Sequence, residues 1–463
     1  MNISSENVNN VGAKERFSFY MAAFFRDMSY AIMAFLSYFY IDVMGLRGAA
    51  LTIIMVLSRL WDGVNDPIIG IYFDKSVTDK GKAAPFFKKT AIPVAILIIF
   101  LFFSPTFSDD PSVNNRFRAL YALITYIIFE GLHTLNGTAF MSLFNSITPN
   151  LEEKNKIISV SRVFSSAGTG VIGGGIPVML SFFENNDVAA KTKIYFFAGV
   201  FVGVCFIIYN YLMYKNVRER VYLVPDKRPK TRDMVRSFMK NRLLFLMILS
   251  NSVAGIINPG NTALWFYTYN LGNAAYMTYI GFTAVPMLIL SSFLVPYLTK
   301  RCEKHHIVIS MSIFQVIVNA VYLIVGYGNI FLVFFFNMLN FLPVLMKNIL
   351  YWNMISDSID YVEYKTGDRN DGMVFAIEGF LGKCIGSVGV ISTVIIVEII
   401  EYVPNAPAQS EYTMKGLFYA PLIITIVSVA LSALPYFFYR FTRAEHRRIL
   451  SELKSRNLDK ECL

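Results

Sequence analysis

Long apolar segments recur along the whole chain, each close to the length that crosses a bilayer. A transmembrane helix needs about 20 predominantly apolar residues. By that measure we expect twelve such helices, at residues 17–41, 46–73, 86–106, 117–146, 158–184, 193–214, 242–270, 274–299, 306–326, 329–356, 372–402 and 416–440. The pattern therefore predicts an all-α integral membrane protein.

A long basic stretch interrupts this series in the middle. Residues 215–242 contain ten Lys and Arg against three acids, and they leave six apolar segments on either side. We therefore expect a first six-helix bundle at 1–214, a cytoplasmic linker at 215–241, a second six-helix bundle at 242–440 and a basic cytoplasmic tail at 441–463.

The two expected bundles carry a short internal repeat. The first expected helix ends in Tyr38-Phe-Tyr-Ile-Asp-Val-Met-Gly45 and the seventh in Trp265-Phe-Tyr-Thr-Tyr-Asn-Leu-Gly272, at an offset of 227 residues. Two parallel six-helix halves are the arrangement of the major facilitator superfamily, in which the substrate binds near the bilayer midplane between the halves.

Composition and charge agree with a membrane environment. The chain is 55% hydrophobic and only 16% charged, with a mean hydropathy of +0.48. The net charge of +10 is confined to short loops without a continuous basic face, which argues against nucleic acid as a partner. The five lysines of residues 74–89 and the basic tail place both termini in the cytoplasm, as expected in a plasma membrane, here a bacterial inner membrane.

Other function classes find little support. The four cysteines have neither metal nor disulfide spacing, and no loop is long enough to hold a catalytic centre. We therefore do not expect an enzyme, nor any cofactor besides a coupling ion.

Ionisable residues inside the apolar segments are the candidates for function, because a charge at the bilayer centre costs roughly 2.5 kcal/mol or more. In the second segment Arg59, Asp62 and Asp66 share one helical stripe, with Asn65 beside them. Two carboxylates and an amide oxygen suit a small cation or a proton-binding pair. The alternative is an Arg–Asp ion pair that only holds helices together, but one acid would suffice for that.

Further polar residues lie in other segments. In the fourth, Glu130, Thr134 and Gly137 share a face, while His133 is expected to be a packing residue. Ion pairs or substrate contacts are expected from Arg26, Asp27, Arg162, Glu378 and Lys383, and cavity-lining positions from Asn258 and Asn261, where the seventh segment is broken. Asp357, Asp360 and Glu363 lie near the cytoplasmic surface, where we expect a gate of ion pairs, with Arg59 in a similar structural role.

These residues bear a family resemblance. The stretch Arg59-Leu-Trp-Asp-Gly-Val-Asn-Asp-Pro67 resembles the R-x-W-D-x-x-N-D-P signature of the glycoside–pentoside–hexuronide:cation symporters, and weaker matches follow in order along the whole chain. The resemblance implies that Asp62, Asn65, Asp66 and Thr134 form the cation site, with the two aspartates as ligands if the ion is Na⁺. It also implies sugar contacts for Asp27, Arg162 and Arg26, and places Lys383 near both sites.

The chain departs from the family pattern on its fourth segment. Gly137 stands where the family has a sugar-binding Asp, and Met141 stands in place of a Trp. Both changes remove contacts to galactosides. Glu130, two turns before Gly137, is a candidate for a displaced carboxylate.

We therefore expect a secondary active transporter that couples Na⁺ or H⁺ to the uptake of a sugar, glycoside or hexuronide by alternating access. The neutral oxygens of Asn65 and Thr134 favour Na⁺. One alternative keeps the fold and carries a non-sugar or lysolipid-like amphipathic substrate. Another is a membrane sensor that has lost transport, against which the retained Asp62 and Asp66 argue.

Overall fold

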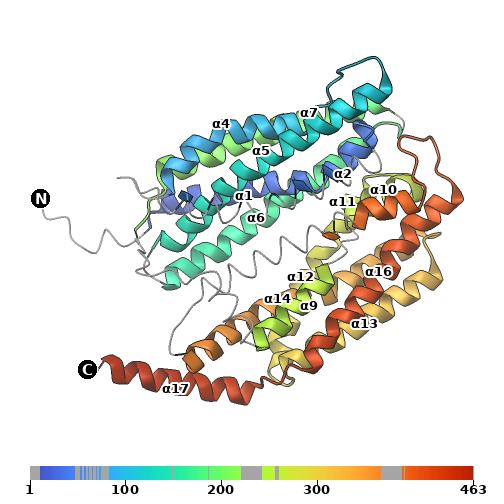
Figure 1. Cartoon of the computed structure of the whole chain (residues 1–463). Helices are drawn as coiled ribbons and strands as arrows, with labels where there is room; N and C mark the ends of the chain where they lie inside the picture. Colours follow the sequence, from blue (N-terminus) through green and yellow to red (C-terminus); the bar gives the residue numbers. More distant parts are fainter. Residues whose placement is uncertain are drawn as a thin grey trace, which may run out of the picture. The chain divides into compact units, whose positions relative to one another are not determined.

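The computed structural model describes residues 11–46, 83–148, 151–185, 187–220, 242–255, 260–366 and 392–461, together with residues 53, 54, 57, 58, 61, 65, 69, 72, 73, 388 and 389. Within these ranges the regular elements are all helices (Figure 1). The chain divides into two compact units. Unit 1 comprises Met1–Asp226, Asn273–Thr278 and Tyr402–Gln409, and unit 2 comprises Lys227–Gly272, Tyr279–Glu401 and Ser410–Leu463.

Unit 1 contains a set of long helices that begin and end at recognisable signals. They are α1 (Ala13–Met33), the short α2 (Leu36–Tyr38), a π-helical turn η2 (Phe39–Val43), α4 (Ala84–Leu101), α5 (Pro111–Ser146), α6 (Leu151–Leu180) and α7 (Val188–Asn216). Asp110 caps α5 by accepting from the backbone N–H groups of Ser112 and Val113, and Asp187 caps α7 through Ala190. The Ser112 hydroxyl, which also donates to Asp110, holds the pKa of that carboxyl below its ordinary value, with smaller contributions from the two backbone N–H groups.

Unit 2 repeats the all-helical construction. Its elements are α9 (Arg242–Gly255), α10 (Gly260–Trp265), the π-helical turn η3 (Phe266–Asn270), α11 (Tyr276–Phe282, whose first residues belong to unit 1), α12 (Ala284–Thr299), α13 (Lys304–Val325), α14 (Ile330–Thr366), α16 (Glu411–Phe437) and α17 (Arg443–Glu461). Residues 392–399 are helical as well.

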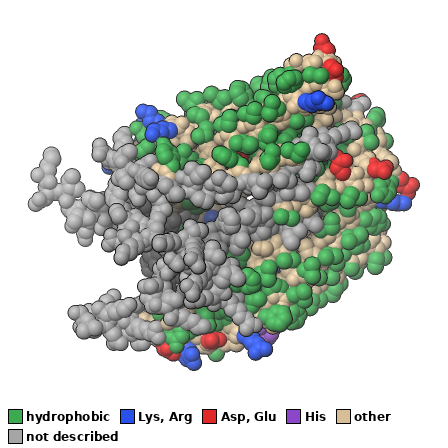
Figure 2. Space-filling view, viewed as in Figure 1, with side chains coloured by type: hydrophobic (Ala, Val, Ile, Leu, Met, Phe, Trp, Pro, Cys, Tyr) green, Lys and Arg blue, Asp and Glu red, His purple; other side chains and the backbone are tan. Residues whose placement is uncertain are grey.

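The outer surfaces of these helices are apolar. Phe293, Ile324 and Phe331 are 75%, 86% and 79% exposed, and Figure 2 shows hydrophobic side chains over much of the visible helical surface, with charged side chains toward the helix ends. Among the described residues, seven helices are long and apolar enough to cross a bilayer. Such exposure is unfavourable in water and favourable in lipid, so these faces are lipid-facing.

Most of the expected apolar segments coincide with helices. The second and eleventh, at 46–73 and 372–402, lie largely outside the described residues, as does the linker from residue 221 onward. Residues 443–461, within the expected basic tail, form the helix α17. Its mean hydropathy is low, so a search for apolar runs does not detect it.

The internal repeat has a structural counterpart. Phe39–Val43 and Phe266–Asn270 are both π-helical, and they are separated by the same 227 residues as the sequence repeat. Gly45 and Gly272 follow at φ +71° and +74°. Glycine adopts this backbone conformation at no steric cost, so the repeat preserves a local backbone conformation and not only a sequence.

The helices of unit 1 are held together by a polar contact near the start of α1 and by close backbone packing farther along it. At the end of α7, Arg220 donates to both carboxylate oxygens of Glu15 on α1, at 2.8 Å each. This hydrogen bond raises the pKa of Arg220, with a further contribution from the charge of Glu15. Further along α1, α6 approaches most closely at Gly168, where an added Cβ would lie 2.9 Å from the carbonyl carbon of Phe24.

Candidate functional site

Asn65, a predicted cation ligand, is buried against α5. Its side chain is among the buried polar groups, and an added Cβ at Gly131 would lie 3.7 Å from the Asn65 Oδ1 atom. The Nδ2 group of Asn65 has no hydrogen-bond partner among the described residues. A buried amide donor without a partner is costly, so the Nδ2 group of Asn65 retains unused hydrogen-bonding capacity.

Thr134 lies three residues after Gly131, on the same face of α5, and is partly buried. Asn65 and Thr134, two of the four predicted cation ligands, therefore lie at the same face of α5. Asn65 comes from the second expected segment, and Thr134 from α5 itself. Asp62 and Asp66, and Arg59 on their stripe, lie outside the described residues. Among the residues that are described, no group of three or more His, Cys, Asp or Glu side chains is placed to hold a metal.

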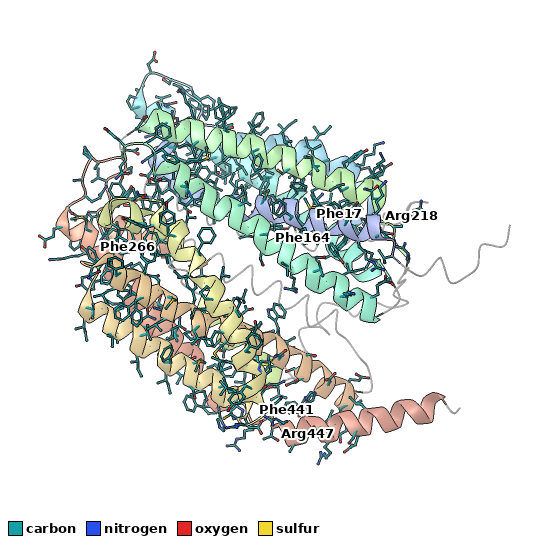
Figure 3. All side chains as sticks on the ribbon, turned by 180° about the vertical axis from the view of Figure 1, so that it is seen from behind. Phe17, Phe164, Arg218, Phe266, Phe441 and Arg447 are labelled. Carbon is teal, nitrogen blue, oxygen red and sulfur yellow. The ribbon has the colours of Figure 1, made fainter. Side chains whose placement is uncertain are left out.

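The predicted substrate residues Arg26 and Asp27 form a polar cluster on α1. Arg26 Nη1 donates to Asp27 Oδ1 at 3.3 Å, and Arg26 Nη2 donates to the hydroxyl of Tyr30 at 3.3 Å. The hydroxyl of Ser165 on α6 donates to Asp27 Oδ2. This cluster joins α1 to α6 inside unit 1, and Figure 3 labels Phe17 on α1 and Phe164 on α6, two helices that pack against each other.

The other predicted substrate residues are only partly placed. Arg162 lies one turn before Ser165 on α6 and is exposed, and Glu130 on α5 is partly exposed. Asn261 lies in α10, where the structure describes the backbone and not the side chain. Asn258, Glu378 and Lys383 lie outside the described residues.

His133 is a packing residue in α5, as its context predicts. Its ring stacks on Phe129 at 4.8 Å and meets Tyr30 edge-on at 4.5 Å, and its Nε2 atom contacts the Ser29 hydroxyl at 3.1 Å. The side chain connects α5 to α1 just beyond the Arg26 cluster.

Lys347 lies within an apolar segment and is absent from the residues predicted from the sequence. It lies in α14, and its Nζ donates to Gln315 Oε1 of α13 at 2.7 Å. Asn319 continues this polar strip by donating to Asn340 at 2.9 Å. Lys347 is a lone lysine in the apolar stretch 329–356, and that signal could have identified it.

A second missed cluster surrounds Asp42 at the end of η2. Tyr402 donates to Asp42 Oδ1 at 2.6 Å, Asn405 donates to the Asp42 carbonyl at 2.5 Å, and Lys191 Nζ lies 3.9 Å from Asp42 Oδ1. Lys191 also donates to Asn405 Oδ1 at 2.8 Å. The segment Tyr402–Gln409 thereby belongs to unit 1, although the chain on both sides of it belongs to unit 2. We refer to this segment as the strap.

The predicted gate residues Asp357 and Asp360 form contacts within unit 2. Lys304 Nζ lies 2.5 Å from Asp357 Oδ2, and His446 of α17 contacts Asp357 at 3.5 Å and Asp360 at 3.0 Å. Glu363 is partly exposed one turn farther along α14. Asp357 and Asp360 therefore attach α17 to α14. That these acids form a gate remains a prediction.

Replacing His446 with alanine is expected to loosen α17. Removing a hydrogen bond to a carboxylate costs about 1.5 kcal/mol, which corresponds to about a tenfold larger population of detached helix. Limited trypsin digestion, which cleaves at Arg447 and Arg448, should then proceed about tenfold faster when cleavage follows that population. Replacing Glu452, which forms an exposed pair with Arg448, should change the rate little. Equal rates in the two variants would show that His446 does not hold the helix.

Comparisons with known proteins agree with this architecture. Residues 20–443 match the family described as MFS/sugar transport protein, where MFS denotes the major facilitator superfamily. The chain is 26% identical to YnaJ of Bacillus subtilis, described as an uncharacterised symporter, over 98% of this chain and 97% of that protein. It is 24% identical to the isoprimeverose transporter of Lactiplantibacillus pentosus, over 98% and 94% of the two chains.

A solved structure shows the fold. The crystal structure of a bacterial homologue of the human lysosomal transporter Spinster aligns with a TM-score of 0.65 at 11% identity, over 93% of this chain and 97% of that one. The chain is thus a multi-pass, all-helical membrane protein with the major facilitator fold. It belongs to the MFS/sugar transport protein family, a family of transporters and not of enzymes.

Proposed function

We propose that the chain is a symporter that couples a cation gradient to the uptake of a sugar, glycoside or hexuronide. The observation that carries the proposal is the buried side chain of Asn65, whose Oδ1 oxygen lies against α5 at Gly131, on the face that bears Thr134. Asn65 lies between Asp62 and Asp66 in sequence, and the spacing predicts both carboxylates within about one helical turn of it. Relatives named as symporters and as an isoprimeverose transporter support the same activity.

The coupling follows from linked binding. A cation bound by Asp62 and Asp66 must raise the affinity for the sugar, and the sugar must raise the affinity for the cation by the same factor. Alternating access of the two halves then carries both together. We propose Na⁺ as the ion, because neutral oxygens such as those of Asn65 and Thr134 assist a metal ion and are unnecessary for a proton site.

The test is uptake into proteoliposomes of a panel of glycosides, pentosides and uronides. Accumulation is measured with a Na⁺ gradient, with a pH gradient and with neither. Accumulation of a panel member under one of the gradients is the expected result. If no sugar accumulates under any gradient while a lysolipid does, the substrate is amphipathic and the sugar proposal is wrong. If nothing accumulates, the transport proposal fails.

The cation site has its own test. Replacing Asp66 with Asn should abolish gradient-driven accumulation while sugar exchange across the membrane persists. Replacing Thr134 with Val should raise the Na⁺ concentration for half-maximal uptake by about tenfold, since one ligand oxygen is lost. Thr138→Val is the matched control, because the Thr138 hydroxyl donates to the Thr134 carbonyl within the same helix. Equal Na⁺ dependence of the two threonine variants would remove Thr134 from the site.

We also propose that both termini of the chain lie in the cytoplasm. The basic loops favour cytoplasmic termini in a bacterial inner membrane.

A further inference from the structure

We propose that the transported sugar carries a negatively charged group, a carboxylate or a sulfonate, and that Arg26 binds it. This inference rests on the proposed function, because it assigns the substrate class of the same site. It depends on four observations around the Arg26 side chain, all of them within unit 1.

The first observation is that the guanidinium of Arg26 is poorly satisfied. Its side chain is only 12% exposed, and its contacts with Asp27 and Tyr30 are both 3.3 Å long. Charge-assisted hydrogen bonds between arginine and a carboxylate are normally about 2.7–2.9 Å. The Nε–H group is buried and has no hydrogen-bond partner. A buried cation with five donors therefore retains unused capacity for an oxyanion.

The second observation is that the guanidinium is held in position by aromatic rings. It lies over the ring of Phe140 at 4.3 Å and over that of Tyr30 at 4.9 Å. Rings bind the flat faces of a guanidinium and leave its edge, which carries the N–H groups, for in-plane acceptors. This arrangement fixes the orientation in which two donors can meet the two oxygens of one carboxylate.

The third observation is that Asp27 is poorly placed to neutralise Arg26. Neighbouring residues on a helix do not face each other, so the pair cannot adopt the parallel, two-bond geometry. The second carboxylate oxygen of Asp27 accepts from Ser165 of α6. Asp27 is the sole acidic contact of Arg26 among the described residues.

The fourth observation concerns Gly137 on α5. An added Cβ at this position would lie 3.1 Å from the hydroxyl of Tyr30, which is itself a partner of Arg26. A carboxylate here would therefore approach the Tyr30–Arg26 pair, and this chain has none. Glu130 lies seven residues earlier on α5, about 10 Å along the helix axis from this position.

Together these features favour an anionic ligand over a neutral one. A neutral sugar offers hydroxyl acceptors to the unused N–H group but no counter-charge, whereas a carboxylate supplies both the charge and two acceptor oxygens. Burying a charge is favourable only when a well-aligned counter-charge accompanies it.

The experiment compares glycosides that differ only in charge. Methyl β-D-glucuronide is compared with methyl β-D-glucoside, and methyl β-D-galacturonide with methyl β-D-galactoside, both as uptake substrates and as ligands that raise the melting temperature of the detergent-solubilised protein. We expect at least one acidic member to be preferred by about tenfold or more. If the neutral members are preferred or equal, or if no acidic member binds, the inference is overturned.

Two variants then locate the preference. Arg26→Gln should reduce the preference for the acidic member about tenfold or more, and Gly137→Asp should do the same by placing a like charge beside the ligand. Gly137→Asn is the matched control, with the same size and no charge. A preference that survives in Arg26→Gln would place the anion elsewhere and overturn the assignment; this variant also suffices if Gly137→Asp does not fold.

The two proposals fail in different ways. An acidic glycoside that binds through Arg26 but accumulates under no gradient would contradict the symporter and leave the anion assignment intact. A neutral glycoside that accumulates with Na⁺ and excludes its acidic counterpart would support the symporter and overturn the anion assignment.

Discussion

Replacing Asp42 with asparagine is expected to lower the free energy of unfolding by about 3 kcal/mol, the lower end of the range for breaking a buried ion pair. The Asp42 side chain is 0% exposed and that of Lys191 is 4% exposed, so the variant leaves a buried cation without its counter-charge. The effect is placed at the lower end because Lys191 Nζ lies 3.9 Å from Asp42 and retains Asn405 as a closer partner. The loss of stability in Asp42→Asn is measured as a fall in the melting temperature of the detergent-solubilised protein.

Two further variants separate the charge from the hydrogen bonds. Tyr402→Phe removes one neutral donor to Asp42 and should cost about 1 kcal/mol. Asp42→Asn combined with Lys191→Met should be more stable than Asp42→Asn alone, because the unpaired charge is removed with its partner. If the single and double variants are equally destabilised, Lys191 does not depend on Asp42.

The strap explains why this cluster is sensitive. Gln409 closes it by bonding both the N–H and the carbonyl of Val403, and Asn405 adopts a φ of +56°, which asparagine tolerates better than most residues. A short, internally bonded segment thus presents Tyr402 and Asn405 to Asp42 together. The carboxylate is shared by the side chains of Tyr402 and Lys191, while Asn405 bonds the backbone carbonyl of the same residue.

Hydropathy was sufficient to predict most of the helices, because lipid requires long apolar runs whatever their tertiary partners. It was insufficient for α17, whose charged residues form a helix held by His446 and not by an apolar run. The repeat ending in Gly45 and Gly272 was visible in the sequence, but its π-helical turns were not. A π-helical turn differs from an α-helical one by a single residue in the spacing of its backbone hydrogen bonds. Over so few residues, this difference leaves no recognisable hydrophobic periodicity.

The residues of the candidate sites were likewise only partly predictable from the sequence. Intramembrane charges identified Arg26 and Asp27, because any charge in lipid requires an explanation. The partners were harder to find, since Ser165 and Tyr402 are ordinary residues whose contacts lie 138 and 360 positions away. Pairings over such separations depend on how helices pack, and a single sequence does not contain that information. The contact of Asn65 with α5 likewise depends on Gly131, whose lack of a side chain was not in itself a signal.

The packing of α1 on α6 sets the position of the whole Arg26 cluster. Gly168 lies three residues after Ser165 on α6, so both residues share the face that meets α1. An added Cβ at Gly168 would lie 2.9 Å from the carbonyl carbon of Phe24 and closer still to its oxygen. The obstacle is backbone, which cannot rotate away as a side chain can, so relief requires the two helices to separate.

Gly168→Ala is therefore expected to reduce the free energy of unfolding by about 3 kcal/mol, the upper end for overpacking, and to abolish sugar uptake. Gly170→Ala is the matched control, because no atom outside its own helix lies within 4 Å of the added Cβ. That change should be neutral or raise stability by up to about 1 kcal/mol through the better helix propensity of alanine. Since Ser165 bonds Asp27 one turn from Gly168, separation of the helices should impair substrate binding even in the fraction of Gly168→Ala protein that remains folded. Melting temperature and uptake in proteoliposomes measure the two effects, and a Gly168→Ala protein that melts and transports like Gly170→Ala would show that α1 and α6 do not need this close contact.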